Sequence, residues 1–167
     1  QAMTTTQKLL DQLENEAATT RKMLSIVPDD KFDWQPHPKS MTIRRLATHI
    51  AELPGWVTMT FDTKELDLAN NPYSTPTINN RAELLDYYEQ ELAKGRASLQ
   101  KAKDEELTED WTLLFNGNVI SVRPKEDVIR MSLNQTVHHR AQLGVFLRLL
   151  DVPIPGSYGP SADESLM

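Results

Sequence analysis

Apolar residues recur at alternating spacings of three and four in four stretches of the chain, a pattern typical of helices with one buried face. The first stretch runs from Thr4 to Val27 and the second from Thr42 to Phe61. The fourth runs from about Lys125 to Leu150, and the third is marked by Leu85, Tyr88, Leu92, Gly95, Leu99 and Ala102. The pattern therefore predicts four amphipathic helices.

The segments between these stretches contain turn and loop residues. Prolines flank His37 in FDWQPHPKSMT, which predicts a loop before the second helix. Within the second helix, Pro54 lacks a backbone N–H and is predicted to kink or interrupt it. Asp62 to Asn80 forms a long polar connection, and Asn116-Gly117 lies between two β-prone runs, which predicts a tight hairpin. Pro153 to Met167 is predicted to be an extended tail.

Four helices with one apolar face each bury those faces by packing on one another. We therefore expect an all-α protein, a single four-helix-bundle domain over residues 4–167 with a small β-hairpin between the third and fourth helices. The long connection after the second helix is suited to a crossover rather than to a simple helical hairpin.

Composition and charge narrow the classes of function. The 167 residues, 39% hydrophobic and 25% charged, are typical of one globular domain. A net charge of -6, with no basic run longer than Arg44-Arg45, argues against a nucleic-acid partner. No apolar run reaches the roughly 18 to 20 residues of a membrane span, so we expect a cytoplasmic protein without a membrane partner. Because the chain has no cysteine, any metal must be bound by nitrogen and oxygen atoms.

Two of the four histidines fall on predicted apolar faces. At about 100° per residue, Val128 lies ~20° from His139 on the fourth helix, and Leu143 lies ~40° from it. His139 is therefore predicted in the middle of the apolar face, with Gln135 one turn before it on the same side. The same geometry makes His49 on the second helix point inward.

Two interpretations of these residues are open at this point. In the first, His49, Gln135 and His139 bind a metal ion between the second and fourth helices. The two imidazoles must then lie within about 7 Å of each other, since Zn–N bonds are ~2.1 Å long. In the second, His49 and His139 are neutral core residues hydrogen-bonded to Gln142, Ser132 or a backbone carbonyl.

Three further residues are weaker candidates. Glu52, three residues after His49, is a candidate general base, but we expect it to be a charge on the solvated face of the helix. His138 is expected at the edge of the apolar face, partly exposed and beside the ligands rather than one of them. His37, in the proline-flanked loop, is expected to be an ordinary exposed residue.

The stretches SMTIRRLATHIAELPGW and NQTVHHRAQLGVFLRLLDVPIPGSYGPSADE resemble the DinB/YfiT-like superfamily of metal-binding four-helix bundles. The resemblance spans nearly the whole chain, and the HHRAQ box is its most specific part. It implies an up-down-down-up bundle, frequently a homodimer, with a three-histidine site for a divalent metal.

The resemblance also assigns positions to the metal ligands. The family pattern is a histidine in the second helix followed by His-x-x-x-His-Arg-Gly-Gln in the last helix. His49 matches the first of these histidines, His139 matches the one before the arginine, and Gln135 replaces the remaining one. An amide oxygen is a weaker donor to zinc than imidazole. The resemblance thus implies that His49, Gln135 and His139 hold a weakly bound divalent ion such as Zn, Ni or Mn.

Two classes of function are compatible with this resemblance. Characterised relatives include thiol-dependent S-transferases, isomerases that use small thiols, and metal-dependent hydrolases. If the chain is an enzyme of this kind, it would act on a small-molecule substrate with the metal as Lewis acid. Any thiol would come from a low-molecular-weight cofactor such as bacillithiol, mycothiol or glutathione, because the protein has no cysteine. The alternative is a catalytically silent bundle with a degenerate metal site that binds a ligand or a partner.

Overall fold

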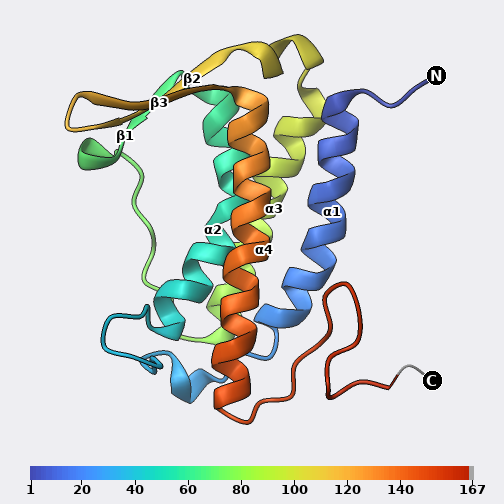
Figure 1. The fold of residues 1–167 in the computed structure, drawn as a ribbon, viewed down its shortest axis with the longest axis vertical. Coiled ribbons are helices and arrows are strands. Elements are labelled where there is room, and N and C mark those ends of the chain that lie inside the picture. Colours follow the sequence, from blue (N-terminus) through green and yellow to red (C-terminus); the bar gives the residue numbers. More distant parts are fainter. Residues whose placement is uncertain (166–167) are drawn as a thin grey trace.

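Four long helices form the bundle in this computed structural model, which describes residues 1–165. They are α1 (Thr5–Leu24), α2 (Ile43–Asp62), α3 (Arg81–Lys101) and α4 (Lys125–Leu149). In Figure 1, α1 and α4 run in one direction and α2 and α3 in the other, which is the up-down-down-up arrangement. Both α1 and α2 pack on α3 and α4. No helix among residues 1–165 has the length and apolar character that a bilayer span requires.

The first three helices begin where the sequence supplies an N-cap. Thr4 accepts a hydrogen bond from the backbone N–H of Gln7, whose side chain in turn accepts from the backbone N–H of Thr4, so the two form a capping box. Thr42 caps α2 and Asn80 caps α3 in the same way, each accepting from an N–H three residues later. These side chains fix the helix starts close to the predicted positions.

The main core lies between the four helices. On α3 the buried residues are Leu84, Tyr88, Leu92, Gly95, Ser98 and Leu99. The sequence predicted Leu85 on the buried face, but its neighbour Leu84 is the buried residue and Leu85 is only partly buried. Leu84, Tyr88 and Leu92, spaced by four, face the bundle.

The closest approach between α2 and α3 occurs at Pro54 and Gly95. A Cβ atom at Gly95 would lie 2.5 Å from the carbonyl oxygen of Pro54, so only glycine fits there without displacing the backbone of α2. Of the two effects predicted for Pro54, a kink or an interruption, the interruption does not occur, because α2 is one continuous helix from Ile43 to Asp62.

A small sheet covers one end of the bundle. The strands β2 (Asp110–Phe115) and β3 (Asn118–Pro124) form the predicted antiparallel hairpin, with Asn116 and Gly117 at φ angles of 50° and 78°. A third strand, β1 (Glu65–Asp67), pairs parallel with β2 inside the segment predicted to be a polar loop. The Asp67 carboxylate accepts the N–H groups of Asn116 and Gly117, both at 2.8 Å, and so ties this segment to the hairpin turn.

Three short 3-10 helices complete the regular structure of residues 1–165. They are η1 (Asp29–Lys31), η2 (Leu68–Asn70) and η3 (Asp104–Thr108). Residues 63–80, here called the crossover segment, contain β1 and η2 and run back along the bundle from the end of α2 to the start of α3 (Figure 1).

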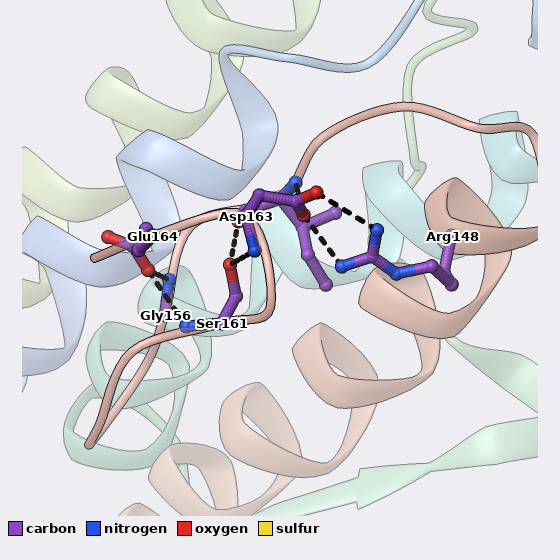
Figure 2. Close-up of polar contacts among 6 residues, drawn as sticks. Arg148, Gly156, Ser161, Asp163 and Glu164 are labelled. Carbon is purple, nitrogen blue, oxygen red and sulfur yellow. Dashed lines mark hydrogen bonds and ion pairs between the residues drawn. The ribbon is translucent and has the colours of Figure 1, made fainter. Parts of the chain in front are cut away.

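The tail after α4 is a closed loop rather than the extended segment predicted from the sequence; Leu166 and Met167 lie outside the described residues. Figure 2 shows the Asp163 carboxylate bound to the Arg148 guanidinium on α4, with the shorter contact at 2.6 Å. The backbone N–H of Asp163 donates a hydrogen bond to the Ser161 hydroxyl oxygen at 3.1 Å. Glu164 accepts the N–H groups of Gly156 and Ser161. Two carboxylates thus close the loop on itself and hold it against α4.

The contact between α2 and α3 leads to a matched pair of predictions about stability. Gly95→Ala should destabilise the fold by about 1–3 kcal/mol, because the new methyl group overlaps the Pro54 carbonyl. Gly144→Ala on α4 should be neutral or stabilising by up to ~1 kcal/mol, because its Cβ would meet Met23 Cε at an ordinary 3.5 Å. Urea unfolding of both variants gives their free energies of unfolding. Equal values would show that the contact between α2 and α3 does not require glycine at position 95.

A second prediction concerns the tail. Hydrogen bonds from Arg148, followed by one from the Ile154 N–H, lower the pKa of Asp163. The carboxylate therefore holds the loop above the usual Asp pKa and releases it as pH falls through the lowered value. Asp163→Ala should accelerate subtilisin cleavage within residues 153–165 at pH 7, as judged by mass spectrometry. Asp11→Ala, at an exposed site on α1, is the control and should cleave like the unmodified protein.

Candidate metal site

His139 lies at the edge of the buried face of α4, not in its centre. Burial on this helix is greatest at Ile129, Leu133, Arg140, Leu143 and Leu147. The prediction of a central His139 is wrong because the sequence pattern was judged from apolar residues alone. Arg140, a charged residue, occupies the centre of this face instead.

Arg140 is 1% exposed and is held by groups from α1 and the tail. Its Nη1 lies 2.7 Å from Glu16 Oε2 and donates to Thr20 Oγ1 at 3.1 Å. Its Nη2 donates to the hydroxyl of Tyr158, which itself donates to Glu16 Oε1 at 2.8 Å. These contacts fix the rotation of α4 about its axis, and with it the direction of the adjacent His139.

The structure brings the three predicted ligands together between α2 and α4. The ring centroids of His49 and His139 lie 4.6 Å apart, with the rings inclined at 77°. The Nε2 atom of His49 lies 3.3 Å from Oε1 of Gln135. The expected proximity of the two imidazoles is therefore confirmed. His138 is exposed, with its ring 4.7 Å from that of His139.

Each histidine of the pair is held at Nδ1 by a residue three positions later on its own helix. His49 Nδ1 lies 2.6 Å from Oε1 of Glu52, and His139 Nδ1 lies 2.8 Å from Oε1 of Gln142. Because a carboxylate only accepts hydrogen bonds, Nδ1 of His49 carries the proton, and a neutral His49 has its lone pair on Nε2. Gln142 was one expected partner; Ser132 donates instead to the Leu53 carbonyl at 2.7 Å.

Glu52 is an orienting residue and not a solvated surface charge. Its side chain is 19% exposed, and its second oxygen accepts a hydrogen bond from Thr75 at 2.9 Å. The expectation of a solvated charge is wrong, because the crossover segment covers this face of α2. With one oxygen on His49 and the other on Thr75, Glu52 fixes the ring and is not a free general base. The His-x-x-Glu spacing was a signal for this pairing, whereas nothing local indicated Thr75.

The electrostatics keep His139 neutral at neutral pH. Burial lowers its pKa below the usual value of 6.5, and the nearby His49 and His138 act in the same direction, while the hydrogen bond that His139 donates to Gln142 Oε1 opposes them. A neutral imidazole is the form that binds metals.

A groove of about 440 Å³ lies beside the N-terminal half of α2, and of the three predicted ligands only His49 lines it. His49 and Glu52 lie in its wall together with Arg44, Arg45 and Thr75. His37 lies elsewhere, in an exposed turn where its Nδ1 accepts from the N–H of Lys39 at 3.1 Å, as expected for an ordinary loop residue.

The donor atoms at the site are two imidazole nitrogens and one amide oxygen. No group of three or more His, Cys, Asp or Glu side chains within residues 1–165 is arranged to hold a metal ion. With Gln135 as the third donor, these residues fit a weak nitrogen and oxygen site but not a strong one.

Fold and site together define a class of protein, the four-helix bundle with a histidine pair between its second and last helices. The model of the DinB family matches residues 3–165, and the chain belongs to this family. It is 28% identical over 152 residues to the uncharacterized protein YrdA of Bacillus subtilis, covering 90% of this chain and 86% of that protein.

Solved structures of the family share the fold. A DinB-like protein from Bacillus cereus is 22% identical, with a TM-score of 0.69 and coverage of 90% of this chain and 95% of that one. The DinB-like protein YjoA from Bacillus subtilis is 15% identical, with a TM-score of 0.71 and coverage of 90% and 97%. At these identities the likeness extends to the arrangement of the helices.

The position of His139 leads to a prediction about its titration. Because the folded-state pKa is depressed, the ring should take up a proton below the usual pH of 6.5. Its contribution to stability is present above the unfolded pKa and is lost as pH falls through the folded one. Two-dimensional NMR of the imidazole resonances, assigned with His139→Ala, is the measurement. A midpoint at or above the unfolded value would contradict the burial of this ring.

Proposed function

We propose that this DinB-family protein binds a divalent metal ion, Zn, Ni or Mn, through Nε2 of His49, Nε2 of His139 and Oε1 of Gln135. The observation that carries the proposal is the pair of oxygen acceptors on Nδ1, Glu52 for one ring and Gln142 for the other. Metal-binding histidines are oriented in this way, with the second ring nitrogen donating to a carboxylate or carbonyl oxygen. Both Nε2 lone pairs are then free for a ligand.

The contact between His49 and Gln135 supports the same proposal. With the proton of His49 on Nδ1, its Nε2 lone pair faces the Gln135 carbonyl oxygen at 3.3 Å. Two acceptors at this distance repel each other unless a cation or a proton lies between them, or the amide turns its NH₂ group toward the ring. A metal ion satisfies both acceptors without changing either side chain.

A metal bound here would supply Lewis acidity, lowering the pKa of a bound water or of a substrate thiol. The protein's own residues would orient the ligands through Glu52 and Gln142 and admit a small molecule through the groove beside Arg44 and Arg45. A metal-dependent hydrolase or a small-thiol S-transferase fits this arrangement, with the thiol supplied from outside because the chain has no cysteine. Cytoplasmic location and a homodimer complete the proposal.

The alternative is a catalytically silent bundle that binds a ligand or partner at a degenerate site. The neutral amide of Gln135 favours this alternative, because it replaces an imidazole by a weaker donor. Metal analysis of the purified and dialysed protein separates the two. Stoichiometric Zn, Ni or Mn supports the metal-dependent function, and a protein that neither retains nor takes up these ions supports the silent bundle.

Replacing Gln135 by histidine tests the ligand set. Gln135→His should raise zinc affinity by at least about tenfold, or ~1.4 kcal/mol, because imidazole is the better zinc donor and position 135 already faces His49 Nε2. Calorimetric titration gives the affinity. The melting temperature should rise only when zinc is present.

Two alanine variants serve as controls for this titration. His139→Ala should abolish the gain, whereas the matched His138→Ala, which removes the adjacent exposed ring, should leave it unchanged. If the Gln135→His protein binds zinc no more tightly than the parent, Gln135 does not face the metal and the ligand set is wrong.

A further inference from the structure

A second cavity, of about 530 Å³, lies between α2, α3 and the crossover segment. Trp56 lines it, and the Trp56 ring also packs edge-on against His49 with centroids 5.9 Å apart. Glu52 lines both this α2–α3 cavity and the groove of the candidate metal site. The charged and aromatic side chains of its wall are Trp56, Tyr73, Tyr87, Glu52, Asp62, Glu91 and Lys94.

The wall of the α2–α3 cavity carries an excess of negative charge, with three carboxylates and one ammonium group. Lys94 is 58% exposed and pairs with Glu91 Oε1 at 2.6 Å, so it neutralises one oxygen from the solvent side. The exposed Asp62 carboxylate forms no hydrogen bond or ion pair with any residue of the described chain. Glu52 is bonded to His49 and Thr75. Asp62 is therefore the unpaired carboxylate of the wall, and Glu91 adds the oxygen Oε2, which Lys94 does not contact.

The Glu91 carboxylate lies against α2 at Gly55, where the lack of a side chain leaves room for it. A Cβ atom at Gly55 would lie 1.8 Å from Glu91 Oε2, so the carboxylate occupies the space a side chain would fill. Glycine in a helix interior costs about 1 kcal/mol relative to alanine. At this position of α2 the glycine brings a carboxylate, only 13% exposed, against the helix backbone.

Tyr87 adds a hydroxyl group to the same wall. Burial, followed by the charges of Glu91 and Glu52, raises the pKa of Tyr87 to about 12, so the phenol stays protonated. The hydroxyl makes no hydrogen bond with the described residues. It is therefore free to bond a ligand.

We propose that the α2–α3 cavity binds the organic ammonium group of a small molecule. Aromatic faces attract such cations through the ring quadrupole, and carboxylates add a direct charge interaction. A cavity of this volume is in the usual range for small-molecule sites. Trp56 and Glu52 place the cavity next to the histidine pair, so the ammonium compound would be the substrate of the proposed metal-dependent function, and that step rests on the proposed function. The binding of an ammonium group in the cavity does not depend on the metal site.

Calorimetric titration with choline, and with its neutral carbon isostere 3,3-dimethyl-1-butanol, tests the proposal. Both molecules have the same shape, so a difference between them reports the charge. Choline should bind at least about tenfold more tightly, in keeping with the strength of cation–π and ion-pair contacts in a partly enclosed site. Equal affinities, or no choline binding at millimolar concentration, would overturn the proposal.

Three variants locate the binding. Glu91→Gln and Tyr73→Ala should each weaken choline binding at least about fivefold, because they remove a carboxylate and an exposed ring from the wall. Gly55→Ala should weaken it similarly by displacing the Glu91 carboxylate, without lowering the melting temperature. Glu126→Gln is the matched control, since Glu126 forms a comparable ion pair with Arg130 on α4 outside the cavity. Choline affinity that survives all three cavity variants would refute the site.

The titrations are performed on protein treated with EDTA and on protein supplied with zinc. If both protein samples bind choline and the protein binds no zinc, the ammonium site in the α2–α3 cavity is supported and the proposed metal function is refuted. Zinc binding without discrimination between choline and its isostere would leave the metal function and overturn the cavity proposal. The two failures are therefore distinguishable.

Discussion

The guanidinium of Arg140 is buried inside the bundle, and a charge in that position must be paired. Its partners Glu16 and Thr20 belong to α1, and Tyr158 belongs to the tail, so α4 is locked in one rotational setting. One residue corresponds to about 100° of helix rotation. An α4 turned so as to expose Arg140 would carry His139 away from α2. The histidine pair thus depends on an ion pair formed with a different helix.

The position of α2 has its own determinants. At Gly95 the α3 backbone comes close to the Pro54 carbonyl, and on the opposite side the Ser132 hydroxyl donates to the carbonyl of Leu53. These contacts involve small residues and consecutive carbonyls one turn from His49. They fix the distance of α2 from α3 and its position along its own axis relative to α4. As a result, His49 faces Gln135 on one side and Glu52 faces the crossover segment on the other.

Much of the fold was predictable because its determinants are local. Apolar periodicity located all four helices, and Asn116-Gly117 located the hairpin, since both signals act over a few residues. The strand β1 was missed because its three residues pair with β2, which lies far along the chain, within a polar segment that has no strand pattern of its own. The centre of the buried face of α4 was misplaced because a paired Arg140 is as buried as leucine, which no hydrophobicity pattern indicates.

The candidate site divides in the same way between local and long-range causes. Glu52 and Gln142 each lie three residues after their histidine, so helix geometry alone brings them to Nδ1 and sets the tautomer. That part can be inferred from the spacing in the sequence. The meeting of the two Nε2 atoms depends on the rotation of α4 and the depth of α2, which are set by Arg140 and Gly95. A substitution at either anchor would therefore leave both histidines correctly oriented on their own helices while separating them from each other.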